Sequence, residues 1–293
     1  MNIALVTYHD KGAYASPTVA NEDDSLLHFL KTKGLTIEKV IWNDTNVRWE
    51  DYDLAILKSP WDYFDLIGDF YNWLAELKSK NIRLLNPIDV VKWNADKHYL
   101  YDIEKAGLKV TPSIFIKQGT HIDLNSYLDT FNGNQLIIKP CVSGGSKNTF
   151  KVTAANVEEV NPKLDLLLQE EDFIIQPFLT EIEEEGEWSF LFFGGKFSHA
   201  LLKKAKAGDF RVQHALGGTI HPQSPPQNLL EDAQKYVDQF AKDCLYARVD
   251  GTIVDQKFLL MELELIEPFL FLDTFENSYE NYYQALSQLI TSK

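Results

Sequence analysis

The chain has 293 residues, of which 45% are hydrophobic and 24% charged, with 43 acidic and 28 basic residues and a formal net charge of −15. A surface this acidic argues against nucleic acid or an anionic membrane as the main partner, although a small anionic ligand needs only a local basic pocket. The length fits two or three lobes better than one simple core.

The first third of the chain alternates strand patterns with helix patterns. The predicted strands are at 3–7, 36–42, 54–58 and 82–85, and the predicted helices are at 23–33 and about 65–80. Gly34 is a typical stop signal for the first of these helices. The alternation predicts a parallel, Rossmann-like sheet. No GxGxxG motif follows the first strand, so a dinucleotide site is not expected there.

The rest of the chain predicts two α+β units. Residues 86–108 mark a boundary followed by one helix that ends at Gly107. The first unit then covers 111–178 and the second covers 186–293. Two such units leave a cleft between them, where ligands tend to bind.

The second unit contains two predicted hairpins. They turn at Gly194–Gly195 and near Asp255–Gln256, and a helix at 226–244 separates them. In the strand after the second turn, Glu262 and Glu264 are two residues apart and therefore share a face.

Counted back through a turn near Asp255–Gln256, Asp250 can reach the same face as these two glutamates. Three converging carboxylates are typical ligands of a hard divalent cation, Mg²⁺ or Mn²⁺, whose charge offsets their repulsion. The alternative is a solvent-facing edge strand with alternating glutamates.

A glycine loop follows the apolar strand that ends in Lys139. Gly144 and Gly145 allow backbone N–H groups to approach an anion, and the lysine supplies a positive charge. The order of residues is not that of a Walker A motif. A phosphate site and an ordinary glycine turn both fit this pattern.

Cys141 and Cys244 make no disulfide framework, which is typical of a cytosolic chain. Cys141 is interpreted as a packed residue rather than a nucleophile, since no histidine neighbours it in sequence. The N-terminus runs directly into the first predicted strand, so no signal peptide is expected, and no apolar run approaches the ~20 residues of a membrane span. We therefore expect a cytoplasmic protein without a membrane partner; monomer and homodimer both stay open.

Taken in order, these motifs resemble the ATP-grasp superfamily, nearest to its glutathione-synthetase-like branch. The resemblance covers about residues 90–293 and implies an ATP-grasp fold with α/β and α+β parts. It implies a Rossmann-like substrate lobe at 1–95, a small subdomain with the phosphate loop at 96–178, and a subdomain with the metal site at 179–293. It also implies ATP and one or two Mg²⁺ ions as cofactors, with Mn²⁺ as a substitute.

The resemblance assigns site residues segment by segment. The implied nucleotide-binding residues are Lys97, Lys139, Ser143, Gly144, Gly145, Ser146, Gln176, Phe178, Leu179, Glu181, Glu183 and Glu187. The implied catalytic residues are Lys203 and Arg211, the latter in the stretch that meets the transferred phosphoryl group and the acyl substrate. The implied metal ligands are Asp250, Glu262 and Glu264.

Two features depart from the family pattern. Glu264 stands where asparagine is frequent, which adds negative charge and favours two Mg²⁺ ions. Lys203, Lys204 and Lys206 are three candidates for one role. The stretches "SPWDYFD" and "ELELIEP" resemble a group of ATP-grasp proteins related to the cycloserine-forming ligase of antibiotic pathways.

These two stretches supply the candidate substrate residues Trp61, Asp62, Tyr63 and Glu267. Trp61 and Tyr63 offer aromatic walls, and Asp62 offers a carboxylate for a substrate ammonium. The alternative for this segment is a plain loop anchored by its aromatic residues.

The resemblance implies an ATP-dependent carboxylate–amine ligase. ATP would phosphorylate the carboxylate of an amino-acid-like substrate, and an amine would displace the phosphate from the resulting acyl phosphate. The alternatives are an intramolecular cyclo-ligase of the same fold, a kinase that stops at phosphorylation, and an ATP-binding module without catalysis. The expected partners are a small acid and a small amine, and neither is identified by the sequence.

Overall fold

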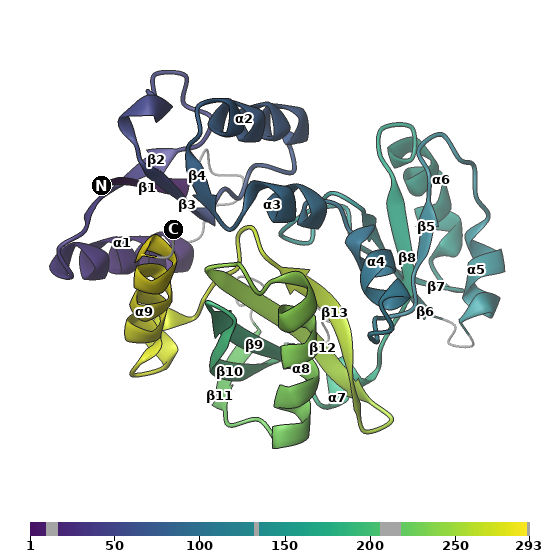
Figure 1. Ribbon diagram of the computed structural model, residues 1–293. Helices are drawn as coiled ribbons and strands as arrows, with labels where there is room; N and C mark the ends of the chain where they lie inside the picture. The colour runs from purple at the N-terminus through teal and green to yellow at the C-terminus, as the bar shows by residue number, and fades with distance from the viewer. Residues whose placement is uncertain (10–16, 132–134, 206–217, 292–293) are drawn as a thin grey trace.

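The computed structural model describes residues 1–9, 17–131, 135–205 and 218–291. It contains three sheets, and Figure 1 shows that they divide the chain into an N-terminal lobe, a small unit and a C-terminal unit. The small unit, made of β5–β8 with α5 and α6, stands apart from the other two (Figure 1).

The N-terminal lobe is built around the predicted parallel sheet. Its elements are β1 (Asn2–Thr7), α1 (Pro17–Thr32), β2 (Thr36–Ile41), the 3₁₀ turn η1 (Trp49–Asp51), β3 (Leu54–Ser59), α2 (Ile67–Ser79) and β4 (Arg83–Leu85). The strand order is β2-β1-β3-β4 and every pairing is parallel, so the predicted Rossmann-like arrangement is confirmed. Nearly every residue of the two central strands is buried, as expected for a sheet covered on both faces.

The helix predicted to end at Gly107 is present, and a second short helix precedes it. The segment forms two short helices, α3 (Ile88–Asn94) and α4 (Tyr99–Lys105). Between them the backbone N–H of Lys97 donates to the carbonyl of Cys141 at 2.9 Å instead of continuing a helix. The break therefore joins the segment that carries Lys97 to the end of β6, which carries Lys139.

The small unit is an antiparallel sheet covered by two helices. Its elements are β5 (Ile114–Ile116), α5 (Leu124–Thr130), β6 (Gln135–Pro140), β7 (Phe150–Thr153), α6 (Val157–Leu167) and β8 (Phe173–Pro177), in the strand order β5-β8-β6-β7. Leu136 and Ile138 of β6 point into a core that α5 and α6 complete. Because side chains alternate along a strand, Ile137 and Lys139 point to the opposite face.

The C-terminal unit is a five-stranded antiparallel sheet with the strand order β11-β10-β9-β12-β13. Its elements are α7 (Glu181–Glu184), β9 (Glu187–Phe193), β10 (Lys196–Lys204), β11 (Thr219–Gln223), α8 (Gln227–Phe240), β12 (Tyr246–Val254), β13 (Lys257–Glu264), η3 (Leu272–Thr274) and α9 (Ser278–Thr291). Both predicted hairpin turns are confirmed. Asp255 and Gln256 have φ values of 50° and 61°, the left-handed pair that a two-residue hairpin turn requires.

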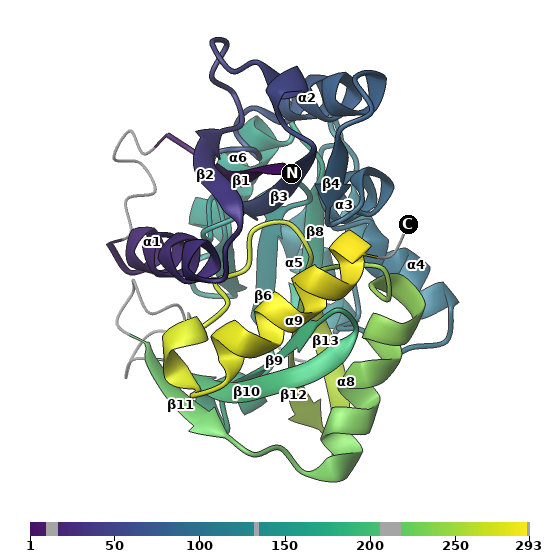
Figure 2. The same ribbon diagram turned by 60° about the vertical axis from the view of Figure 1, so that its left-hand side comes forward.

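The two faces of this sheet have different partners. On one face α8 and α4 pack together around Phe190, Val249 and Leu260. On the other face α9 crosses β9 and β10 beside α1, as Figure 2 shows. Here side chains of the N-terminal sheet, such as Ile3 and Leu54, share one core with Tyr282 and its neighbours in α9. The N-terminal lobe and the C-terminal unit are therefore fixed against each other, whereas the small unit has a core of its own.

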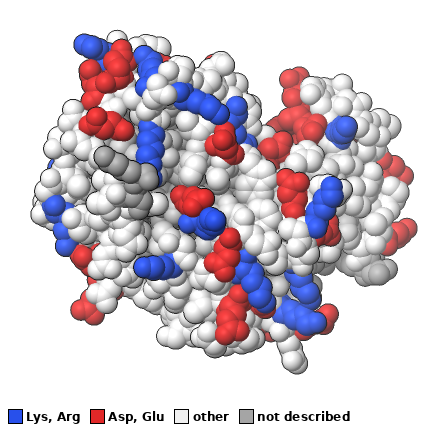
Figure 3. Space-filling view, in the orientation of Figure 1, with Lys and Arg blue, Asp and Glu red and all other residues white. Residues whose placement is uncertain are grey.

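The surface carries charges of both signs. Figure 3 shows Lys and Arg intermingled with Asp and Glu on the face in view, with no broad basic patch. None of the described helices is long and apolar enough to cross a membrane.

Candidate active site

The hairpin of β12 and β13 carries the three predicted metal ligands. Even counting from its turn would place Asp250 opposite Met261, on the wrong face. A β-bulge between Asp250 and Gly251 absorbs one residue, so that Asp250 lies opposite Glu262. Directly opposed residues share a face, so Asp250, Glu262 and Glu264 lie on one face of the hairpin. A Cβ on Gly251 would lie 2.3 Å from the carbonyl oxygen of Leu259, so the bulge leaves room only for glycine.

Arg248 explains how two of these carboxylates coexist. It lies opposite Glu264 and two residues before Asp250, on the same face. Its guanidinium pairs with Asp250 at 2.8 Å and also pairs with Glu264. The sequence analysis missed this residue, although its spacing of two from Asp250 on a predicted strand was a usable signal.

Lys203 and Ser189 complete the surroundings of Asp250. The Lys203 ammonium lies 3.2 Å from one Asp250 oxygen, and the Ser189 hydroxyl donates to the other at 2.6 Å. Lys203 also pairs with Glu187. Although burial opposes ionisation, Arg248 and Lys203 hold the pKa of Asp250 well below its usual range. Asp250 is therefore a fixed anion.

Glu262 joins the small unit to the C-terminal unit. Its carboxylate accepts a hydrogen bond from Lys139 at 2.8 Å and lies 4.0 Å from the ammonium of Lys97. Against the effect of burial, these two lysines lower the pKa of Glu262 to about 2. Burial lowers the pKa of Lys97. The two predicted nucleotide lysines and one predicted metal ligand thus meet at one point.

The donor set fits a hard divalent cation by its chemistry, because carboxylate oxygens are what Mg²⁺ prefers. In this structure the oxygens of the three ligands do not all lie within 4.8 Å of one another. In the described part of the chain, the group that does meet that limit is Asp96, His98 and Cys141. Arg248, Lys139 and Lys203 instead supply the positive charge. Burial and the negative charges of Asp250 and Glu262 raise the pKa of Glu264 to about 7, although Arg248 acts in the opposite direction. An additional positive charge beside Glu264 would therefore favour its ionised form.

The face of the small sheet that carries Lys139 holds several of the predicted nucleotide residues. The register places Ile137 opposite both Gln176 and Lys151, so these side chains share that face with Lys139. The Lys151 ammonium lies 3.5 Å from the centre of the Phe178 ring. The sequence analysis missed apolar Ile137 and cationic Lys151, although the alternation of side chains along β6 and β7 places both on the face that carries Lys139.

The adjacent helix α7 carries the predicted acidic residues. Glu183 is exposed and pairs with Lys151 at 3.1 Å, whereas Glu181 is half-buried. Leu179, just before this helix, is half-buried as well. Gln176 donates from its side-chain amide to the Ser113 hydroxyl at 3.0 Å. These positions border the joint between the small unit and the C-terminal unit.

The predicted phosphate loop is held from two sides. On one side, the Lys97 ammonium donates to the carbonyl of Ser143 at 2.9 Å and to the Ser143 hydroxyl at 3.1 Å. From the N-terminal lobe, Phe64 packs on Gly144 and Asp65 pairs with Lys147. Two consecutive loop residues, Gly145 and Ser146, have left-handed φ values of 58° and 62°. The loop is thus docked on the segment that follows Trp61.

Replacing Gly144 by alanine is expected to displace this loop. A Cβ at Gly144 would lie 2.5 Å from the Phe64 ring, and such overpacking costs about 1–3 kcal/mol. We expect the KM for ATP to rise about tenfold, measured by ADP release at varied ATP concentration. Gly68→Ala is the matched control, because its Cβ meets nothing within 4 Å. Combining Gly144→Ala with Phe64→Ala should restore the KM; no rescue would mean that the clash is not the cause.

The predicted substrate loop of the N-terminal lobe is anchored at the side chains of Trp61 and Asp62. The Trp61 indole N–H donates to the carbonyl of Glu267 at 3.0 Å. The Asp62 carboxylate accepts from Trp42 at 2.6 Å and from Asn43 at 3.3 Å. Asp62 was expected to meet a substrate ammonium, but in this structure both of its oxygens have partners within the lobe. These contacts favour the anchored-loop alternative for Asp62.

Tyr63 and Glu267 lie within electrostatic range of Glu264 at the end of β13. Burial, and next the charge of Glu267, raise the pKa of Tyr63 well above its usual range. Burial and the neighbouring charge of Glu264, partly offset by Lys97, raise the pKa of Glu267 to about 8. The two residues therefore belong to the same polar site as Lys97 and Glu264.

Two of the predicted residues lie outside the described residues, namely Arg211 and Lys206. Of the other two lysine candidates, Lys203 is buried against Asp250 and Glu187, whereas Lys204 is exposed. Of these two candidates, Lys203 is therefore the one that lies beside the predicted metal ligand Asp250. Cys141 is buried, and burial raises the pKa of its thiol, in agreement with the interpretation as a packed residue.

A second buried charged cluster was not predicted. Lys58, at the end of β3, pairs with Glu22 at 3.0 Å and Asp23 at 3.2 Å, both from α1. Glu22 also accepts the backbone N–H groups of Leu270 and Leu272 at 2.9 and 3.0 Å. A lysine at the end of the apolar run "LAILK" was the available signal. The cluster fixes the loop after Glu267 against the start of the substrate loop.

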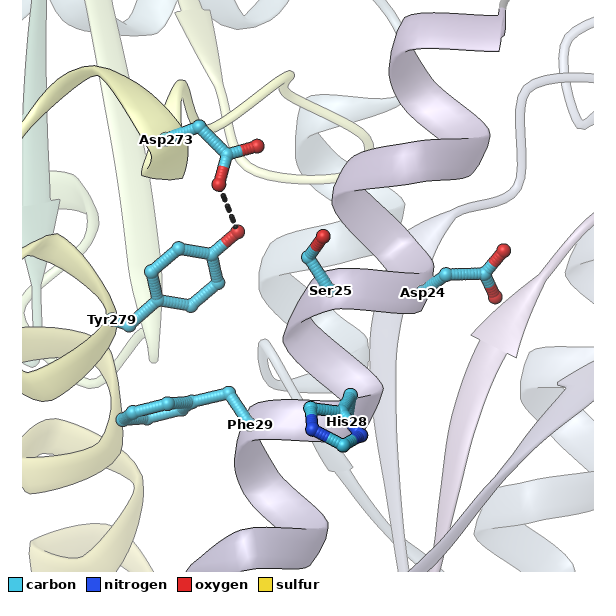
Figure 4. Close-up of a pocket in the computed structure, with 6 residues that line it drawn as sticks. All are labelled: Asp24, Ser25, His28, Phe29, Asp273 and Tyr279. Atoms are coloured by element: carbon cyan, nitrogen blue, oxygen red, sulfur yellow. Dashed lines mark hydrogen bonds between the residues drawn. The ribbon is translucent and has the colours of Figure 1, made fainter.

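One surface depression lies away from this site. It has a volume of about 430 Å³ and is lined by Asp24, Ser25, His28 and Phe29 of α1 together with Asp273 and Tyr279. Figure 4 shows the hydrogen bond that the Tyr279 hydroxyl donates to Asp273, which has a length of 2.7 Å. None of the predicted site residues lines it.

Comparison with known proteins gives two family matches. Residues 108–264, more than half of the chain, match the model of the prokaryotic glutathione synthetase ATP-grasp domain. Residues 3–86 match the model of the N-terminal domain of D-cycloserine synthetase DcsG. The second match covers the N-terminal lobe, and the first covers the small unit and the C-terminal unit up to the end of β13.

Individual relatives agree with the family models. The cycloserine biosynthesis protein DcsG of Streptomyces lavendulae is 26% identical over 284 residues, which are 90% of this chain and 92% of that protein. The crystal structure of D-cycloserine synthetase DcsG superposes with a TM-score of 0.83 at 24% identity, over 98% of this chain and 99% of the other. The D-alanine–D-alanine ligase of Bacillus anthracis, complexed with ATP, superposes with a TM-score of 0.74 at 17% identity, over 99% and 97% of the two chains. The predicted ATP-grasp fold is thereby confirmed.

Proposed function

Because the chain belongs to the family of prokaryotic glutathione synthetase ATP-grasp domains and is an ATP-grasp ligase, we propose that it activates the carboxylate of an amino-acid-like substrate as an acyl phosphate. One observation carries the proposal. Lys97 and Lys139, from two different segments, meet the carboxylate of Glu262 at 4.0 and 2.8 Å. Paired cations beside a carboxylate group are what the transfer of a γ-phosphoryl group requires.

The proposed reaction has two steps. An oxygen of the substrate carboxylate attacks the γ-phosphorus of ATP, and the bond from that phosphorus to ADP breaks. An amine then attacks the carbonyl carbon of the acyl phosphate, a C–N bond forms, and phosphate leaves as the amine loses a proton. The products are ADP, phosphate and an amide-type compound.

In this proposal the small unit binds the nucleotide. Lys97 and Lys139 hold the phosphates, and the docked loop from Ser143 to Ser146 covers them and excludes water. The other residues proposed for the nucleotide are Gln176, Phe178, Leu179, Glu181, Glu183 and Glu187. The position of Gln176 on the face that carries Lys139, and the contact of Phe178 with Lys151 of that face, support this assignment.

The C-terminal unit carries the proposed metal ligands Asp250, Glu262 and Glu264. These carboxylates would hold Mg²⁺, which would supply positive charge against the charge that develops during phosphoryl transfer. Lys139 and Lys203 pair with Glu262 and Asp250 and orient these two carboxylates. Lys203 and Arg211 are proposed to stabilise the transferred phosphoryl group.

Replacing Lys97 or Lys139 by alanine should weaken ATP binding by about 1.5–3 kcal/mol, the range for charge-assisted hydrogen bonds. Titration calorimetry with ATP and Mg²⁺ measures this loss. Lys117→Ala is a matched control, because Lys117 is exposed on the same unit. Unchanged ATP affinity in both site variants would reject the nucleotide assignment.

The function itself is tested by ADP release with ATP and Mg²⁺ in a screen of amino acids and small peptides. Hydroxylamine should convert an acyl phosphate into a hydroxamate, whereas a kinase would leave a stable phosphorylated product. The resemblance of residues 3–86 to the N-terminal domain of D-cycloserine synthetase favours a second candidate, an intramolecular ring closure. That candidate predicts ADP release with one substrate that carries both the acyl group and the amine.

A further inference from the structure

Three side chains with different ligand atoms meet at the joint between the small unit and the segment before α4. Asp96 and His98 come from the break between α3 and α4, and Cys141 directly follows β6. Each residue offers one ligand atom, namely a carboxylate oxygen, an imidazole nitrogen and the thiol sulfur, and these three atoms all lie within 4.8 Å of one another. The proposed ligase reaction uses none of these three side chains.

Main-chain hydrogen bonds bring the three residues together. The N–H of Lys97, which lies between Asp96 and His98, donates to the carbonyl of Cys141 at 2.9 Å. The N–H of Cys141 donates in turn to the carbonyl of Asp172 at 2.8 Å, so both main-chain polar groups of the cysteine are held. The N–H of His98 donates to the Asp96 carboxylate at 2.9 Å, which keeps that carboxylate beside the imidazole. The grouping is therefore built by the backbone rather than by long side chains that meet on the surface.

The imidazole of His98 is held next to the other two ligand atoms. Its Nδ1 lies 2.6 Å from Oδ1 of Asp96, and its ring stacks on Phe115 of β5 with ring centres 4.3 Å apart. The side chains of His98 and Asp96 are 40% and 39% exposed, whereas Cys141 is buried. The thiol thus forms the inner end of a site that opens to solvent through the imidazole and the carboxylate.

This set of ligand atoms suits Zn²⁺ rather than Mg²⁺. Thiolate and imidazole are typical zinc ligands, whereas Mg²⁺ takes oxygen ligands. Zinc bond lengths of about 2.0–2.3 Å in a tetrahedral shell place two ligand atoms about 3.3–3.6 Å apart. The 2.6 Å contact is shorter than this and the 4.8 Å limit is longer, so binding requires side-chain shifts of about 1 Å. The thiol releases its proton to solvent as the Zn–S bond forms.

The charges around the thiol also favour a cation. Burial is the main reason why the pKa of Cys141 is raised, and the negative charges of Asp96, Asp172 and Glu171 act in the same direction. Lys97 acts against them. Three carboxylates and one ammonium leave these surroundings with a net negative charge, so a divalent cation that takes the place of the thiol proton is favoured by its neighbours.

We propose that Asp96, His98 and Cys141 form a zinc-binding site, with water as the fourth ligand. This site uses different side chains from the proposed magnesium site on β12 and β13, and it does not rest on the proposed ligase function. Lys97 lies between two of the ligands, and Lys139 lies two residues before the third. A bound zinc ion therefore adds a second tie, besides the main-chain hydrogen bond, between the two segments that carry these lysines.

The test is a titration of the metal-free protein with Co²⁺ in the presence of excess Mg²⁺. Cobalt(II) occupies zinc sites and gives a sulfur-to-cobalt charge-transfer absorption when a thiolate binds it. We expect this absorption to saturate at one equivalent of Co²⁺ and to disappear when Zn²⁺ is added. Cys141→Ser should abolish the absorption, and both Cys141→Ser and His98→Gln should weaken cobalt binding by at least about 100-fold.

Two variants serve as matched controls. Cys244→Ser changes the other buried free cysteine, and His121→Gln changes an exposed histidine that also pairs with an aspartate, Asp165, at 2.9 Å. Both should bind Co²⁺ as the wild type does. His98→Gln alters a half-exposed side chain, so the test stands even if Cys141→Ser does not fold.

Zinc should also stabilise the folded protein, because the unfolded chain does not hold the three ligands together. At a free Zn²⁺ concentration of about 100 times the Kd, the melting temperature of the wild type should rise by about 5 °C or more, and that of His98→Gln should stay nearly unchanged. Differential scanning calorimetry measures both.

Four results would overturn the proposal. They are no cobalt–sulfur absorption in the wild type, the same absorption in Cys141→Ser, unchanged cobalt affinity in His98→Gln, and a melting temperature that Zn²⁺ does not raise. Displacement of Co²⁺ by Mg²⁺ would assign the ion to the carboxylates of β12 and β13 and would also reject the site. Since none of these measurements depends on ADP release, their failure leaves the proposed ligase function to its own test.

Discussion

Replacing Glu262 by glutamine is expected to reduce ADP formation by at least about 100-fold while the fold stays intact. Glu262 accepts from Lys139 at 2.8 Å and lies 4.0 Å from Lys97, so it is the point where the two units meet. A neutral amide balances the charge of neither lysine and is a poorer ligand for Mg²⁺. The metal lowers the activation barrier of phosphoryl transfer by several kcal/mol. The measurement is ADP release at saturating ATP and amino acid.

The control for this change is Glu158→Gln, on the exposed side of α6. It should retain the full rate. The circular dichroism spectrum of Glu262→Gln should match that of the wild type, whereas its melting temperature should fall, because Lys97 and Lys139 lose a carboxylate partner. Wild-type turnover in Glu262→Gln would remove Glu262 from the proposed metal site.

Replacing Arg248 by methionine should destabilise the protein by about 3–5 kcal/mol, the usual cost of removing one partner of a buried ion pair. Arg248 holds both Asp250 and Glu264, and the side chain of Asp250 is only 3% exposed. Methionine fills a similar volume but leaves both carboxylates with less positive charge. Urea unfolding at pH 7 measures the loss.

Arg48→Met is the matched control, because Arg48 pairs with Asp51 at 3.5 Å on the open surface. Exposed pairs contribute at most about 1 kcal/mol. The folded-state pKa of Asp250 is lowered, so its ion pairing stabilises the protein above the ordinary pKa of aspartate and is lost as the pH falls toward the lowered value. The difference in the free energy of unfolding between Arg248→Met and the wild type should therefore become smaller under acidic conditions. A difference that stays constant down to pH 2 would assign the effect to packing.

Local patterns predicted much of the fold and of the site. Alternation placed Lys139 at the end of an apolar strand, and the turn at Asp255–Gln256 identified the hairpin that carries Glu262 and Glu264. Each of these inferences depends on neighbours within a few residues. The same holds for the glycine loop, whose left-handed backbone at Gly145 follows from its composition.

The features that were missed depend on tertiary contacts. The bulge at Asp250 cannot be counted from the turn, and it decides which residue of β13 Asp250 faces. The helix break before α4 is invisible in the periodicity because its cause is a hydrogen bond from Lys97 to Cys141, 44 positions away. The partners of Asp62 lie 19 and 20 positions away in sequence.

The packing of α9 has a consequence for the order in which the chain can fold during synthesis. The core of the small unit uses only residues between Ile116 and Ile175, so it can form as soon as that stretch has emerged. The N-terminal sheet emerges earlier, yet one of its faces is covered by Tyr282 and Leu286 of α9. The first sheet to be synthesised must therefore keep an apolar face exposed until nearly all of the remaining chain has been made, and during that interval it is the part of the molecule most in need of a chaperone.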